Sequence, residues 1–178
     1  MRIHHALHSF ATATTLCAFA RLFAQSGTLD QSFNASDIGF GAGDGFTGTP
    51  QVVLEQPDGK ILAAGFLRTV PQVQGNAGFG IGRMDPNGAL DPTFTAAIAS
   101  GQDARALSLQ SDGKIIAAIS YWYGTGSSTL KRYNADGSVD NTFASGSTQA
   151  GKIDRTAVLP DGKVMVVGNF GGYAGSFR

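Results

Sequence analysis

Aspartate is the side chain with the most evident chemical potential in this sequence, since 12 of the 13 acidic residues are Asp. Two carboxylates roughly 5–10 Å apart could hydrolyse a glycosidic bond. Asp30, Asp91 and Asp140, however, recur at one place in a repeat, each three residues before a Phe. A catalytic residue usually occurs once in a chain and is not repeated in every unit. We therefore interpret these Asp residues as structural, bonding local backbone while the Phe fills the gap between repeated units.

A fragment of a calcium-binding pattern is present at Asn134, Asp136 and Asp140, with oxygen ligands at alternate positions and Gly137 for a turn. The bidentate Glu that completes such a loop is missing, and residues 85–91 repeat the same spacing. Asp-Gly and Asn-Gly turns require these residue types in any case. We therefore favour turns over a metal site, and we expect no cofactor.

Tyr121, Trp122 and Tyr123 form a singular aromatic group that contains the only Trp of the chain. Aromatic faces stack on sugar rings or pack against partner proteins. Adjacent residues of a strand point to opposite faces, so at least one ring should point away from the core. These residues are the candidate site for binding a protein or a carbohydrate. The alternative is a strand end with one or two rings in the core.

The glycine-rich segment from Gly43 to Gly48 matches the Gly-x-Gly-x-x-Gly pattern of phosphate-binding loops. Such a loop needs a strand before it and the N-terminus of a helix after it. Here a Gly-rich loop precedes the segment, and Thr49-Pro50 and a strand follow it. We therefore do not expect a nucleotide site.

The N-terminus resembles a secretory signal peptide, because an apolar run from Phe10 to Phe23 follows a weakly basic start. After Ser26 the composition changes to a Gly- and Asp-rich pattern of strands and turns. An ordinary N-terminal helix is the alternative, and the run is too short and polar to be a good membrane span. We predict a signal peptide at residues 1–24 and a mature chain at 25–178, secreted or at the cell surface, without a membrane span.

Cleavage of this leader would remove most of the residues that catalyse reactions. All three His and the only Cys lie within the first 17 residues. A mature chain without them has no disulfide, no His/Cys zinc site, no Cys nucleophile and no Ser-His-Asp triad. The formal net charge of zero, from 13 basic and 13 acidic residues, gives no electrostatic reason to expect a nucleic-acid partner.

Two sequence signatures recur three times and alternate along the chain. One ends in Leu/Val-Asp-x-Ser/Thr-Phe. The other is an Asp-Gly turn followed by Lys and an apolar strand, with Asp spacings of 54 and 49, at Asp58-Gly59, Asp112-Gly113 and Asp161-Gly162. Gly in a tight hairpin adopts positive φ without steric cost. We therefore expect all three glycines at positive φ, and we expect Lys114 to be exposed at the turn edge.

Each repeat is interpreted as antiparallel strands joined by tight turns. In the first repeat we expect strands at residues 51–55, 60–65 and 78–84, and a shorter fourth at 89–94. The second repeats this order at 106–109, 114–120 and 128–133. A four-stranded unit of this length is the size of a propeller blade. The sequence therefore predicts an all-β fold of antiparallel four-stranded blade-like repeats, a partial β-propeller of about two and a half to three units.

These signatures resemble the bacterial delta-60 repeat. Gly-x-Leu/Val-Asp-x-Ser/Thr-Phe, x-x-Asp-Gly-Lys-Ile/Val and Arg-x-Asn-x-Asp-Gly follow one another between Gly27 and Gly168. The second unit fits best, through Lys131 to Gly137, whereas the first departs from the pattern at Arg83 to Gly88. The resemblance implies β-propeller blades in an exported bacterial protein, with no established activity.

The third repeat stops after its second strand, and closed propellers have roughly 4–8 blades. We therefore expect the N-terminal part of a longer protein, with further repeats of the same polypeptide. The expected function is an exported, non-enzymatic scaffold for binding or cell-surface interaction. The alternatives are a secreted propeller enzyme that cleaves polysaccharide through paired Asp carboxylates, and a purely structural surface protein.

Overall fold

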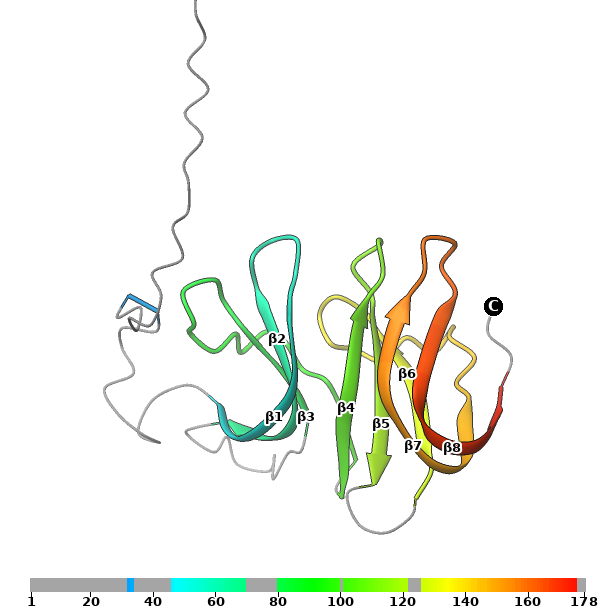
Figure 1. The fold of residues 1–178 in the computed structure, drawn as a ribbon. Coiled ribbons are helices and arrows are strands. Elements are labelled where there is room, and N and C mark those ends of the chain that lie inside the picture. The colour runs from blue at the N-terminus through cyan, green and yellow to red at the C-terminus, as the bar shows by residue number, and fades with distance from the viewer. Residues whose placement is uncertain (1–31, 34–45, 70–79, 100, 122–125, 176–178) are drawn as a thin grey trace, which may run out of the picture. The chain divides into compact units, whose positions relative to one another are not determined.

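The computed structural model describes residues 32–33, 46–69, 80–99, 101–121 and 126–175, all within the part of the chain from Gln31 to Arg178. These residues form strands and turns without a helix, so the predicted all-β class is confirmed (Figure 1). None of them belongs to a helix long and apolar enough to cross a membrane. The predicted signal peptide at residues 1–24 lies outside the described residues. The eight strands are β1 (Phe46–Glu55), β2 (Ile61–Thr69), β3 (Gly80–Met84), β4 (Gln102–Leu109), β5 (Ile115–Tyr121), β6 (Ser128–Tyr133), β7 (Ser147–Val158) and β8 (Val164–Ala174).

The strands form two antiparallel sheets, with the orders β1-β2-β3 and β4-β5-β6-β7-β8. The link between β6 and β7 is a single pair, Thr129 with Ser147, whereas the other neighbouring strands pair along most of their length. We therefore describe three units. Unit 1 is β1–β3 with the segment that follows to Phe94, unit 2 is β4–β6 with the segment to Phe143, and unit 3 is the hairpin β7–β8.

The hairpin turns lie where the repeat predicts them. Gly59, Gly113 and Gly162 have φ of 81°, 83° and 82°, the left-handed region that favours glycine. In each turn the glycine N–H donates to the carbonyl three residues earlier. The preceding Asp accepts, through Oδ1, a bond from the N–H of the following Lys, at 3.1–3.2 Å. The sequence Asp-Gly-Lys therefore builds the same turn three times.

The short fourth segment of each blade-like unit is reduced to one bridge. Leu90 pairs with Met84 in unit 1, and Val139 pairs with Tyr133 in unit 2. The chain then turns sharply, because the N–H of Phe94 donates to the carbonyl of Asp91 at 3.4 Å. The next unit's first strand follows from there, so the segment crosses to the neighbouring unit instead of extending the sheet.

Two apolar clusters lie between successive units. The first joins Leu62, Ala64 and Ile81 of unit 1 to buried residues of β4, β5 and β6, and Phe94 belongs to it. The second joins Ile116 and Ala118 of unit 2 to Ile153 of unit 3, and Phe143 belongs to it. The expectation that the repeated Phe fills the gap between units therefore agrees with both clusters.

Candidate functional site

Asp91 and Asp140 are each surrounded by side chains from three parts of a unit, whereas Asp30 lies outside the described residues. The first is a Lys that follows the hairpin turn, the second is an Arg near the end of the third strand, and the third is a Thr two residues after the Asp. In unit 1 these form the Asp91 cluster: Lys60, Arg83, Asp91 and Thr93. In unit 2 they form the Asp140 cluster: Lys114, Arg132, Asp140 and Thr142.

In the Asp91 cluster every bond of the carboxylate is directed to a neighbour of the same unit. Oδ2 accepts from Lys60 Nζ at 2.7 Å and from Arg83 Nε at 2.8 Å. Oδ1 accepts from the Thr93 N–H at 2.9 Å and from the Thr93 hydroxyl at 2.6 Å. The carboxylate thus has two partners on each oxygen, and its side chain is only 4% exposed.

The Asp140 cluster repeats this geometry closely. Oδ2 accepts from Lys114 Nζ at 2.8 Å and from Arg132 Nε at 2.7 Å. Oδ1 accepts from the Thr142 N–H at 2.9 Å and from its hydroxyl at 2.6 Å. Lys114 is therefore an ion-pair partner of a buried carboxylate, and the expectation of a merely exposed Lys at this turn edge is wrong.

The two arginines also connect each cluster to the cores between units. The guanidinium of Arg83 lies 4.8 Å from the centroid of the Phe94 ring, a cation–π distance. Arg132 lies over Phe143 in the same way, at 4.9 Å. Arg83 Nη1 additionally donates to the Ala135 carbonyl of unit 2 at 2.6 Å. The clusters therefore fix the position of the segment that passes from one unit to the next.

These contacts keep both carboxylates ionised. Burial by itself raises the pKa of Asp91, but hydrogen bonds from Lys60, Thr93 and Arg83 outweigh burial and hold that pKa well below its usual range. Hydrogen bonds from Lys114, and then from Thr142, hold the pKa of Asp140 well below its usual range in the same way. A carboxylate of this kind has no proton to give as a general acid, and all of its bonds are already made.

Asp103 is a buried carboxylate that sequence reasoning missed. It lies near the start of β4, opposite Ser120 of β5, and it is 2% exposed. Its Oδ1 has no hydrogen-bond partner among the described residues, and its Oδ2 lies 3.7 Å from Arg105 Nε. Burial raises the pKa of Asp103, although Arg105 and Lys152 oppose this rise. The predicted strand begins only at residue 106 whereas β4 begins at Gln102, so no pattern in the sequence marks Asp103 as buried.

The aromatic candidate is described at one position. Tyr121 ends β5 and is 51% exposed, which is the orientation expected for at least one ring of the group. Trp122 and Tyr123 lie outside the described residues. Tyr121 is thus available to a partner or a ligand in the described part of the chain.

The calcium-like residues lie in the last turn of unit 2. Asn134 Nδ2 donates to the Ser138 hydroxyl at 2.9 Å, and Asp136 Oδ1 accepts from the N–H and hydroxyl of Ser138. Asp140 is held by its own cluster and faces two cations. The described residues include no group of three or more His, Cys, Asp or Glu side chains that could hold a metal ion.

The Gly-rich segment does not lead into a helix. Phe46, Thr47 and Gly48 begin strand β1, whereas residues 43–45 lie outside the described residues. A phosphate cradle requires the N–H groups of a helix N-terminus at this point. A strand therefore lies where such a cradle would place a helix.

Comparison with known families gives one match. A family model described as a domain of unknown function, the DUF5122 beta-propeller, matches residues 56–94, 110–143 and 159–178, which is more than half of the chain. The first two matched ranges start at the hairpin turns and end at Phe94 and Phe143, so each contains a complete Asp cluster. Neither the curated proteins nor the solved structures gave a match.

Proposed function

Because the chain belongs to the DUF5122 β-propeller family, we propose that it is an exported, non-enzymatic propeller scaffold that binds a protein or a carbohydrate outside the cell. Units 1, 2 and 3 are then blades of this propeller. We further propose that its repeat is of the delta-60 type. Export rests on the leader-like composition of residues 1–24 and on a mature chain that would have neither His nor Cys.

The observation that carries a scaffold role is the use made of the repeated Asp residues. Asp91 and Asp140 each accept four hydrogen bonds from Lys, Arg and Thr. These are the residues that a polysaccharide-cleaving propeller would have used as paired carboxylates. Since these carboxylates are ionised and their oxygens already accept two hydrogen bonds each, the residues that recur in the family pattern serve the fold. Specificity must then come from residues that differ between units.

Tyr121 is such a residue. It is the last residue of β5, whereas Leu67 occupies the equivalent place inside β2 of unit 1. An exposed ring next to Trp122 and Tyr123 in the sequence can stack on a sugar ring or anchor a partner surface. We therefore assign the binding surface to the β5 end of unit 2.

A glycan array and a pull-down with exported protein test this proposal. We expect Tyr121→Ala to lower binding at least about fivefold, because one anchor residue commonly contributes more than about 1 kcal/mol. Leu159→Ala is the control, since Leu159 is also exposed, at 38%, but lies in the turn of unit 3. Equal loss in both variants, or no captured ligand at all, would remove the binding role.

The enzyme alternative can be tested in the same preparation. Asp103 is the buried Asp of the described residues outside the two clusters, so it is the residue that a hydrolase would have to use. We expect release of reducing sugar at the background level for both the original chain and Asp103→Asn. Release that disappears in Asp103→Asn would establish the enzyme in place of the scaffold.

A further inference from the structure

The turn that follows β3 contains the one Asn-Gly sequence of the chain, Asn87-Gly88. The Gly88 N–H donates to the Asp85 carbonyl at 2.8 Å, and Gly88 has a φ of 87°. Asn87 is exposed, and its Oδ1 accepts from the Ala89 N–H at 3.2 Å. Its Nδ2 has no hydrogen-bond partner among the described residues. The carboxamide is therefore held by one long hydrogen bond and is open to water.

The equivalent turn of unit 2 has the same geometry but carries an Asp in place of the Asn. The Gly137 N–H donates to the Asn134 carbonyl at 2.9 Å, and Gly137 has a φ of 89°. Asp136 Oδ1 accepts from the Ser138 N–H at 2.9 Å, and hydrogen bonds from Ser138 lower the pKa of Asp136. A charged acceptor makes the stronger hydrogen bond. A carboxylate in place of the Asn87 carboxamide is therefore compatible with this turn.

Asn followed by Gly allows the backbone to attack the side chain, because Gly has no side chain that hinders its nitrogen. The deprotonated Gly88 nitrogen forms a bond to Asn87 Cγ, and the bond from Cγ to Nδ2 breaks. Nδ2 leaves as ammonia, with the proton that Gly88 gave up returned through solvent. Water then opens the cyclic imide, at Cγ to give aspartate or at the backbone carbonyl to give isoaspartate. Water is the only other reactant.

We propose that Asn87 is a deamidation site of this chain and that the fold retains the aspartate product. The attack requires the Gly88 N–H to leave the Asp85 carbonyl, so the reaction proceeds through local opening of this surface turn. Isoaspartate adds one atom to the backbone before Gly88. A Cβ on Gly88 would already lie 2.7 Å from the Phe33 ring, so a displaced Gly88 has no room there. The aspartate form therefore keeps the turn, and the isoaspartate form loses it.

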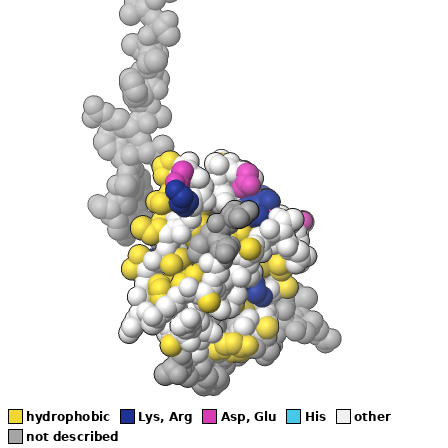
Figure 2. All heavy atoms as spheres, turned by 90° about the vertical axis from the view of Figure 1, so that its right-hand side faces the viewer, with side chains coloured by type: hydrophobic (Ala, Val, Ile, Leu, Met, Phe, Trp, Pro, Cys, Tyr) yellow, Lys and Arg dark blue, Asp and Glu magenta, His cyan; other side chains and the backbone are white. Residues whose placement is uncertain are grey.

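The reaction adds one negative charge at the end of the molecule that carries the hairpin turns. A Cβ on Gly59 in the first hairpin turn would lie 3.3 Å from the Pro86 ring, so the two turns are neighbours. Figure 2 shows acidic and basic side chains close together at this upper end of the molecule, on the side of unit 3. In unit 1, Lys60 Nζ lies 3.4 Å from Asp85. The new charge therefore meets solvent and a nearby ammonium group, and its cost to the fold is small.

Incubation of the purified chain at mildly alkaline pH, followed by peptide mapping with mass spectrometry, tests the site. We expect conversion at Asn87, while the Asn residues that precede bulkier neighbours keep their amides: Asn134, Asn141 and Asn169. Asn87→Gln is the matched control, because it keeps a carboxamide but would need a larger ring, and it should not react. Asp136→Asn creates a second Asn-Gly pair in the equivalent turn, and this pair should react at about the rate of Asn87.

The same chain incubated in urea shows whether the folded protein reacts. An Asn87 that converts in urea and stays intact in the folded chain would overturn the proposal, as would equal conversion at several Asn residues. An unreactive Asp136→Asn beside a reactive Asn87 would overturn the part assigned to the turn. Asn87→Asp, which supplies the product directly, should unfold at the urea concentration of the original chain. A lower midpoint would show that the fold does not accept the aspartate.

Discussion

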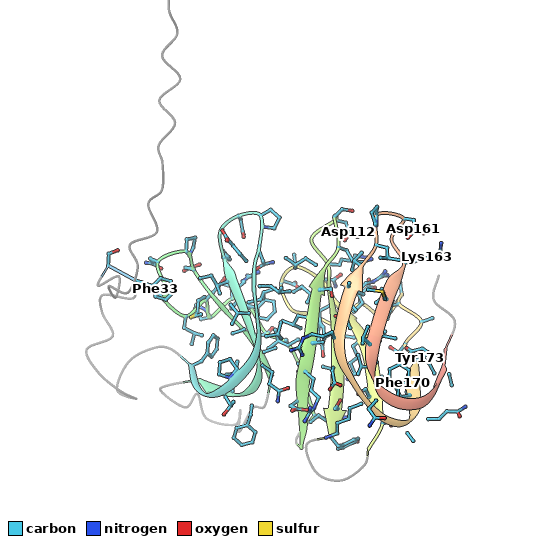
Figure 3. All side chains as sticks on the ribbon, viewed as in Figure 1. Phe33, Asp112, Asp161, Lys163, Phe170 and Tyr173 are labelled. Carbon is cyan, nitrogen blue, oxygen red and sulfur yellow. The ribbon has the colours of Figure 1, made fainter. Side chains whose placement is uncertain are left out.

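Units 1 and 3 have the same turn in their first hairpin and differ in the ion pair and the burial that accompany it. Lys60 of unit 1 reaches Asp91, a carboxylate that is 4% exposed, at 2.7 Å. Lys163 of unit 3 instead pairs with Asp161 of its own turn at 2.6 Å, and both side chains are largely exposed (Figure 3). The turn glycines have nearly identical φ of 81° and 82°. The turn is therefore specified locally, whereas the ion pair and the burial depend on a segment that follows the third strand.

The largest expected difference between units 1 and 3 is the loss of stability when an apolar side chain after the turn is truncated. Leu62→Ala should lower the free energy of unfolding by about 2–5 kcal/mol, because it leaves a cavity in a fully buried site. Met165→Ala, at the equivalent position, should cost less than about 1 kcal/mol. Urea denaturation measures both. Equal costs would mean that Met165 is buried as deeply as Leu62, which would contradict the comparison.

The second largest expected difference is the loss of stability when the Asp of an ion pair is removed from unit 1 or from unit 3. Asp91→Ala should cost about 2 kcal/mol, since it leaves Arg83 and partly exposed Lys60 without their carboxylate. Asp161→Ala should have no measurable effect, because its partner is a solvated Lys. Since the pKa of Asp91 is lower in the folded state, its contribution is present above the unfolded pKa near 3.9 and is lost as the pH falls. The deficit of Asp91→Ala relative to Asp161→Ala should therefore be constant from pH 7 to about pH 5 and should begin to narrow only below about pH 4.

The hairpin turns of units 2 and 3 should lose similar stability when their glycine is replaced, although the two units differ elsewhere. A Cβ added at Gly113 or Gly162 would meet no atom within 4 Å, so the cost of a side chain comes from the positive φ alone. Gly113→Val and Gly162→Val should each cost about 1–2 kcal/mol. The same denaturation assay measures them, and Lys163→Ala, at an exposed position, is the control. A cost confined to Gly113 would show that the turn of unit 3 is not fixed by its own sequence.

The local sequence pattern predicts the turns and most strands of the fold correctly, but it misplaces the start of the first strand in units 1 and 2. The hairpin turns, the strand that follows each turn and the burial of Phe94 and Phe143 agree with the sequence. The first strands were predicted too short, because β1 begins at Phe46 instead of residue 51 and β4 at Gln102 instead of 106. In both strands the register shifts, between Pro50 and Val52 and between Ala104 and Ala106. Such a bulge breaks the alternation from which strands are recognised.

The Asp clusters were predicted only in part, for a different reason. The recurrence of Asp and Phe indicated a structural role, and the bond from Asp91 to Thr93 is local. The partners Lys60 and Arg83 come from 31 and 8 positions away, so only the folded unit shows that they share one oxygen. Asp103 has no repeat equivalent and therefore gave no periodic signal.

The smallest expected effect concerns Asp103, which is buried like Asp91 but has no such set of partners. Because burial raises its folded pKa, the stability linked to its protonated form is present below the unfolded pKa near 3.9 and is lost as the pH rises through the folded value. Asp103→Asn, which is neutral at every pH, should therefore stabilise the chain at pH 7 by less than about 1 kcal/mol, a figure reduced for solvent screening. The gain should shrink as the pH approaches 3, the opposite of the trend for Asp91→Ala, whose deficit shrinks there. Exposed Asp154→Asn on β7 is the matched control and should change stability at neither pH. A loss of stability in Asp103→Asn at pH 7 would mean that the ionised carboxylate and Arg105, at 3.7 Å, form a stabilising pair, and the contrast between a satisfied and an unsatisfied buried aspartate would no longer hold.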